Sequence, residues 1–140
     1  MAPVGYLLDT DTCIVLIGEH QPSERDRVLG RLGGLRDAPV SISTVTLFEL
    51  TFGVEFSRHR KQNAAALEQF LLDFEILPFD QAAAGQAGRV RAILERRGSR
   101  IGPMDTLIAG HALSTGKVLV TGNTREFSRV DGLIIEDWTT

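Results

Sequence analysis

Five short apolar runs alternate with helix-like segments along this chain of 140 residues, and this alternation strongly limits its fold. The runs are typical of strands, and they cover residues 4–8, 39–43, 75–79, 117–121 and 133–136. Strands that are apolar throughout are typical of parallel sheets with helices on both faces. The sequence therefore predicts a three-layer α/β fold with a central, mostly parallel sheet of about five strands.

Helical patterns fill the gaps between these runs. They cover residues 10–17, 22–35, 45–58, 62–74 and 81–97, and Pro103 and Gly116 open and close a further helix. Thr10 or Asp11 is the expected N-cap of the first helix, because short polar side chains accept from unpaired helical amides. With no repeat or linker in the sequence, we expect residues 1–140 to form a single domain.

The composition excludes several classes of protein. A hydrophobic fraction of 43% excludes a disordered chain. No apolar run approaches the roughly 18–20 residues of a membrane span, and no secretory signal is visible, so we expect a soluble, cytoplasmic protein. The single cysteine, Cys13, has apolar neighbours and is expected to be a buried structural thiol.

The basic residues are unevenly distributed, although the net charge is −3. Thirteen of the fifteen are arginines, and they cluster in residues 58–61 and 89–100. Arginine pairs with phosphate in a bidentate way, and basic patches around an acidic centre suit a nuclease. Solvated helix faces explain the same clusters about equally well.

Four acidic side chains follow strand ends or a helix start: Asp9, Glu49, Asp105 and Glu126. Sites in open parallel sheets form beyond the carboxyl ends of the strands, so these acids are expected to converge there. Carboxylates gathered in one place repel each other unless a cation lies between them. A divalent metal ion with oxygen ligands meets that need, so the leading hypothesis is a metal-dependent hydrolase.

Each candidate also has a simpler explanation. Asp9 could merely end a strand and cap a helix, and Asp105 could only stabilise a helix dipole. Glu49 lies three residues after Thr46, which matches a capping box, but Ser43 or Thr44 is the expected cap of that helix. Glu49 then lies in the second turn, where its apolar neighbours require a partner, which favours a role in the site. Asp11 could be a cap, a partner of a ligand or a ligand itself, and His111 is expected to be a core or boundary histidine.

Four motifs occur in order along the chain, followed by Glu-Asp-Trp at residues 136–138. They are Leu-Leu-Asp-Thr-Asp at 7–11, Ser-Thr-Val-Thr-Leu-Phe-Glu-Leu at 43–50, Ile-Gly-Pro-Met-Asp-Thr-Leu-Ile-Ala at 101–109 and Val-Thr-Gly-Asn-Thr-Arg-Glu-Phe at 120–127. With this set the chain resembles the PIN-domain ribonucleases, specifically the VapC-type toxins of bacterial toxin–antitoxin pairs. The resemblance spans the whole chain and implies an α/β/α PIN-like domain.

The resemblance also implies a site. In that family three or four acids bind Mg²⁺ or Mn²⁺ and hydrolyse RNA phosphodiester bonds. Carried over by motif, Asp9, Glu49 and Asp105 are the core acids. Many members have Asp where this chain has Asn123, and Glu126 is the nearby acid. The implied catalytic set is therefore Asp9, Glu49, Asp105 and Glu126, and the implied metal ligands are Asp9, Glu49, Asp105 and Asn123.

The partners implied by the resemblance are an RNA substrate, with transfer RNA favoured, a VapB-type antitoxin and a second copy of the chain. Cleavage is expected to leave 5′-phosphate and 3′-hydroxyl ends, because no catalytic histidine pair is evident. An acidic, metal-binding pocket is readily blocked by an inserted arginine, which supplies positive charge and five donors. No membrane partner is expected.

Two alternatives remain open from the residues. Asp-Thr-Asp-Thr at 9–12 matches the nucleophile motif of haloacid-dehalogenase-like phosphohydrolases, with Asp9 as nucleophile. That fold needs a later lysine, whereas the only lysines, Lys61 and Lys117, both precede Thr121. The other alternative is a non-catalytic binding module whose acids only cap helices and which has no metal affinity.

Overall fold

A parallel sheet forms the centre of the computed structural model, which describes residues 5–140. Five strands lie in the order β3-β2-β1-β4-β5, and every neighbouring pair is parallel. The strands are β1 (Tyr6–Leu8), β2 (Val40–Ser43), β3 (Glu75–Leu77), β4 (Val118–Val120) and β5 (Ile135–Glu136). The predicted α/β class and the predicted sheet are confirmed.

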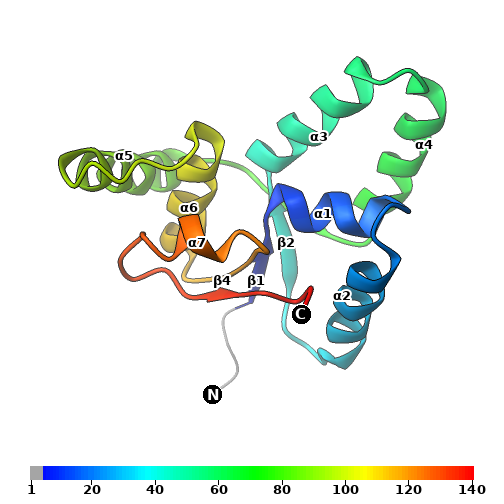
Figure 1. Ribbon diagram of the computed structural model, residues 1–140, viewed down its shortest axis with the longest axis horizontal. Helices are drawn as coiled ribbons and strands as arrows, with labels where there is room; N and C mark the ends of the chain where they lie inside the picture. The colour runs from blue at the N-terminus through cyan, green and yellow to red at the C-terminus, as the bar shows by residue number, and fades with distance from the viewer. Residues whose placement is uncertain (1–4) are drawn as a thin grey trace.

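Seven helices of the described residues surround this sheet. They are α1 (Thr10–Ile17), α2 (Pro22–Gly34), α3 (Thr44–Phe56), α4 (Arg60–Leu71), α5 (Gln81–Arg96), α6 (Pro103–Thr115) and α7 (Thr124–Phe127). Figure 1 shows α5 and α6 on one side of the sheet and α1 and α2 on the other, which gives three layers. In the same view α3 and α4 form an arm that projects beyond the sheet.

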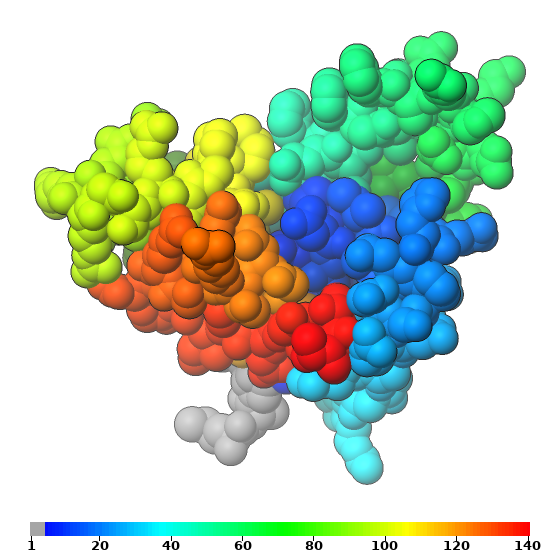
Figure 2. Space-filling view, viewed as in Figure 1, coloured from blue at the N-terminus to red at the C-terminus, as the bar shows by residue number. Residues whose placement is uncertain are grey.

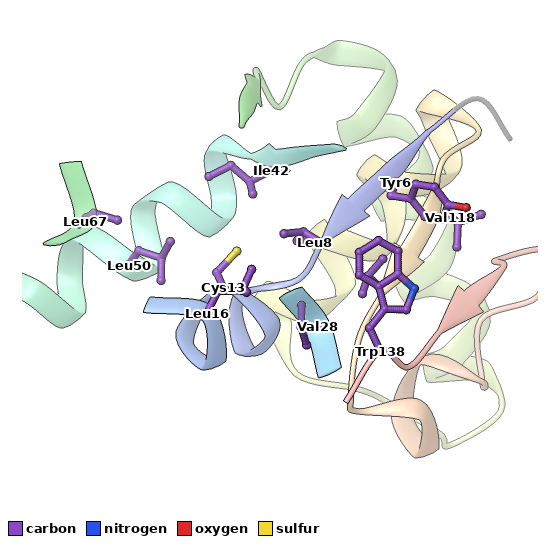
Figure 3. Packing of buried hydrophobic residues seen from close by; sticks show 11 residues of the cluster. Tyr6, Leu8, Cys13, Leu16, Val28, Ile42, Leu50, Leu67, Val118 and Trp138 are labelled. Atoms are coloured by element: carbon purple, nitrogen blue, oxygen red, sulfur yellow. The ribbon is translucent and has the colours of Figure 1, made fainter. Parts of the chain in front are cut away.

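Each face of the sheet packs against its own apolar cluster. Leu8 and Val120 lie in the cluster shown in Figure 3, with Cys13 of α1 and Val28 of α2. Adjacent strand residues point to opposite faces, so Leu7 and its neighbour Leu119 pack into the other cluster, on the α5 and α6 side. Because both faces are covered there, the central strands β1 and β4 are apolar and buried throughout. Cys13 is fully buried, and burial raises the pKa of its thiol, as expected of a structural cysteine.

Several predicted ends were wrong by one to three residues. The strand predicted over residues 4–8 begins at Tyr6, and Val4 lies outside the described residues. The strand predicted over 75–79 ends at Leu77, just before Pro78, which has no N–H to donate to a sheet. The helix predicted over 62–74 runs instead from Arg60 to Leu71.

Two local features differ in kind from the prediction. Asp9, not Thr10 or Asp11, is the N-cap of α1. The four-residue helix α7 was not predicted, because one turn is too short to show a periodic apolar pattern.

The C-terminal segment is held against α2 (Figure 1). Trp138 is buried, packs 5.1 Å from the ring of Tyr6 and donates from Nε1 to Glu136 Oε1 at 2.9 Å. Arg31 of α2 reaches the same Glu136 oxygen at 3.0 Å. Among the described helices, none is long and apolar enough to cross a membrane.

Candidate active site

Asp9 lies at the carboxyl end of β1, the central strand, and only 2% of it is exposed. It is the N-cap of α1, and one carboxylate oxygen accepts from the backbone N–H of Thr12 at 2.8 Å. Burial raises the pKa of Asp9 to about 6, although hydrogen bonds from Thr121 and Thr12 act in the opposite direction. Asp9 therefore does cap α1, but its buried position makes ionisation of the carboxyl group unfavourable.

Glu49 lies in the second turn of α3, as predicted. The partner that its apolar neighbours require is a hydroxyl group: Thr10 Oγ1 donates to Glu49 Oε1 at 2.5 Å. Thr10 Oγ1 also lies 3.1 Å from Thr46 Oγ1. Residues of α1 and α3 thus meet at this carboxylate.

Asp105 lies in the first turn of α6. Its pKa is raised to about 7, first by burial and then by the negative charges of the four other acids near the sheet edge: Asp9, Glu126, Asp11 and Glu49. Such repulsion requires proximity, so the structure brings together acids that are far apart in the sequence. In Figure 2 the dark blue of α1 meets the segments that carry α3, α6 and α7 near the middle of one face.

Asn123 and Glu126 form a pair at α7. Asn123 Nδ2 donates to Glu126 Oε2 at 3.1 Å, and Asn123 N donates to Thr121 Oγ1 at 2.9 Å. The amide of Asn123 therefore fixes the position of Glu126, and Glu126 supplies the negative charge that reaches Asp105. Sequence reasoning named both residues but gave no sign of the hydrogen bond between them.

Within residues 5–140, no cationic side chain balances the charges of this acidic centre. Asp9, Asp11, Glu49, Asp105 and Glu126 form no ion pair with any described residue; the ion pairs of residues 5–140 lie elsewhere. Within that part of the chain no three acidic, imidazole or thiol groups are close enough to share one ion. Mg²⁺ usually keeps several waters and binds through one or two carboxylates, so this donor set fits such an ion.

Several other candidates lie outside the acidic centre. His111 is buried, its Nδ1 lies 2.7 Å from Ser43 Oγ, and burial lowers its pKa, so it is the core histidine that was expected. Many arginines of the two basic clusters form surface ion pairs, including Arg97 with Asp131 and Arg60 with Glu55, which agrees with the solvated-face explanation. The acids of the acidic centre line neither of two hollows elsewhere, one of about 540 Å³ beside α5 and α6 and one of about 770 Å³ between α2 and α4.

Comparisons with known proteins agree with this arrangement. The PIN domain family matches residues 6–133. The tRNA(fMet)-specific endonuclease VapC of Shigella flexneri is 44% identical over 134 residues, which are 96% of this chain and 98% of that protein.

Solved structures give the same result. A chain in DNA-bound VapBC from Salmonella typhimurium superposes with a TM-score of 0.84 at 43% identity, covering 96% of this chain and 98% of that one. A chain in VapBC2 from Rickettsia felis, bound to a promoter DNA fragment, gives a TM-score of 0.86 at 37% identity over 95% of this chain and 98% of that one. This chain therefore belongs to the PIN-domain family, among its VapC ribonucleases.

Proposed function

We propose that this ribonuclease cleaves RNA with Mg²⁺ or Mn²⁺ held at the acidic centre. Among Asp9, Glu49, Asp105 and Glu126, one or two would hold the ion directly and the others would hold it through water, with the amide oxygen of Asn123 as a neutral ligand. The observation that carries the proposal is the convergence of acids on Asp105, with no ion pair to any cationic side chain of the described chain.

A bound divalent ion supplies an activated water and neutralises charge on the scissile phosphate. The contribution of the chain is to hold its acids in fixed places. Asp9 is held by the backbone N–H of Thr12, Glu49 by Thr10 and Glu126 by Asn123. Exposed arginines would hold flanking phosphates, and the products would carry 5′-phosphate and 3′-hydroxyl ends.

The substrate and partners follow from the relatives. We propose a transfer RNA substrate, because the Shigella and Salmonella relatives carry the name tRNA(fMet)-specific endonuclease. We propose a VapB-type antitoxin as partner, because the similar structures are VapBC complexes. The family resemblance further suggests a homodimer. Membership of the PIN-domain family displaces the haloacid-dehalogenase alternative.

Purified protein tests the cation requirement directly. We expect cleavage of transfer RNA with Mg²⁺ or Mn²⁺ and no cleavage in EDTA. Asp105→Asn is expected to lose activity roughly 100-fold or more, because the ion contributes several kcal/mol to charge stabilisation. The matched control is Asp131→Asn, an exposed acid paired with Arg97, which should cleave at the parental rate. Full activity in EDTA would refute the proposal.

A further inference from the structure

Two threonines from different helices meet at the carboxylate of Glu49. Thr10 is the first residue of α1, and Thr46 and Glu49 belong to the first two turns of α3. Thr10 Oγ1 lies 2.5 Å from Glu49 Oε1 and 3.1 Å from Thr46 Oγ1. We refer to these three groups, Thr46, Thr10 and Glu49, as the hydroxyl relay.

The number of protons fixes the direction of the relay. A threonine hydroxyl carries one proton, and an ionised carboxylate can only accept. Thr10 therefore donates to Glu49, and Thr46 donates to Thr10. Thr46 is fully buried, and Thr10 Oγ1 is its hydroxyl's hydrogen-bond partner among the described residues. Hydrogen bonds linked in series strengthen one another in a low-dielectric setting.

The relay leaves half of the carboxylate available. Glu49 Oε1 accepts from Thr10, whereas Oε2 makes no hydrogen bond within residues 5–140. Thr10 also follows Asp9 directly, so the relay links the backbone that carries Asp9 to the side chain of Glu49. Ordering a free glutamate side chain costs rotamer entropy, and the relay removes much of that cost before any ligand binds.

We propose that Thr10 and Thr46 are positioning residues that hold Glu49 in the arrangement that binds a divalent cation. This inference rests on the cation site proposed above. The hydroxyl groups act through Glu49, so their effect belongs to cation affinity and not to RNA binding. Outer partners of this kind typically change metal affinity by roughly 10- to 100-fold.

Calorimetry separates this role from catalysis: the metal-free protein is titrated with Mn²⁺ alone, in the absence of RNA, and the Kd is measured. Thr10→Val keeps the β-branched shape and removes the hydroxyl, and we expect it to raise the Kd for Mn²⁺ roughly 10-fold or more. Thr10→Ser keeps the hydroxyl and should bind nearly as the parent does. Thr115→Val is the matched control, because among the described residues that hydroxyl bonds only to backbone carbonyls near the end of α6.

The kinetics provide a second readout. At saturating Mn²⁺ we expect Thr10→Val to recover most of the parental kcat, with the KM for RNA unchanged. If Thr10→Val does not fold, Thr46→Val takes its place and is expected to weaken Mn²⁺ binding in the same direction by a smaller factor.

Each contrary result has a distinct meaning. A parent protein that binds no Mn²⁺ overturns the cation site and this inference together. If the parent binds Mn²⁺ and Thr10→Val or its substitute Thr46→Val binds equally well, the relay is overturned while the cation site stands. If Thr10→Ser and Thr10→Val weaken Mn²⁺ binding equally, the relay is also overturned, since loss of the hydroxyl would not be the cause.

Discussion

In the metal-free protein, the ionisation of Asp9 and Asp105 has the largest effect on how stability depends on pH. Their ordinary pKa is 3.8, and in the fold it rises to about 6 for Asp9 and about 7 for Asp105. Since both values lie above those of the unfolded chain, the folded state binds more protons between about pH 4 and pH 7. The stability gained from the protonated forms is complete below pH 4 and is lost as the pH rises through 6 and 7.

We therefore expect the metal-free protein to unfold at a lower temperature at pH 8 than at pH 5, by on the order of 5 °C. Asp105→Asn should reduce this difference and, at pH 8, melt at the parental temperature or above it, although its RNA cleavage is expected to be slower by roughly 100-fold or more. Thermal unfolding in EDTA, followed by circular dichroism, measures both effects. Added Mn²⁺ should raise the parental melting temperature at pH 8 through binding to the folded state.

The opposite result has a clear interpretation. A large drop in the melting temperature of Asp105→Asn at pH 8 would mean that Asp105 serves mainly to stabilise the α6 dipole.

The acids of the site could be predicted one by one because strand ends and helix starts are visible in the sequence. Asp9, Glu49 and Asp105 were placed on the correct elements by this reasoning. The hydrogen bond from Asn123 to Glu126 and the contact between Thr10 and Thr46 could not be predicted. Both depend on side-chain rotamers, and the second joins residues 36 apart in the chain.

At the scale of elements, the sequence predicted every described strand and every described helix except α7. It predicted the first and last residues of these elements less accurately. Apolar patterns locate the middle of an element, whereas its ends depend on local hydrogen bonds. Ser43 illustrates this: it ends β2 and also caps α3 through the N–H of Val45, at 3.0 Å. The sequence allowed either Ser43 or Thr44 in that position.

The crossing of α5 and α6 is a contact that no pattern in the sequence indicates. Gly110 of α6 is buried, and a Cβ atom placed on it would lie 2.4–2.6 Å from the backbone and side chain of Ala87. Glycine inside a helix is ordinarily unfavourable by roughly 0.5–1 kcal/mol relative to alanine. Here it allows the two helices to approach closely, and α6 carries Asp105.

Gly110→Ala is therefore expected to destabilise the protein by about 1–3 kcal/mol, because the backbone of Ala87 must shift. Gly88→Ala on α5 is the matched control, since an added Cβ there meets nothing within 4 Å. The control should be neutral or stabilised by roughly 0.5–1 kcal/mol. Urea unfolding measures both free energies, and equal stability of Gly110→Ala and the parent would refute the close crossing.

At the scale of the whole molecule, the outer face of α3 has no partner within the described chain. Phe48, Phe52 and Phe56, which we call the α3 aromatic face, are 61%, 59% and 81% exposed. The rings of Phe52 and Phe56 stack at 5.5 Å. Apolar exposure on this scale marks an interaction surface. Phe52 lies three residues after Glu49 on the same helix, so a partner covering this face also reaches the acidic centre.

We expect the proposed antitoxin to cover this face. Phe52→Ser with Phe56→Ser should weaken binding of the antitoxin by roughly 10-fold or more, the loss typical of buried aromatic anchors. RNA cleavage by the purified double variant should be unchanged. The matched control is Ile134→Ser, because Ile134 is 65% exposed but precedes β5, away from α3. Binding to the purified VapB-type antitoxin is measured by calorimetry.

Bacterial growth tests whether the antitoxin covers the α3 aromatic face in cells, and sedimentation tests whether that face instead joins two copies of the chain. Expression of the parent should arrest growth, co-expression of the antitoxin should restore it, and the double variant should remain toxic despite the antitoxin. Asp9→Ala should not be toxic; toxicity equal to that of the parent would place the activity outside the acidic centre. The parent alone should sediment as a dimer. Suppose instead that the double variant sediments as a monomer and still binds the antitoxin fully. The α3 aromatic face then joins two copies of this chain. Removing the rings of Phe52 and Phe56 weakens only the interface that buries them, which in that case is the dimer interface.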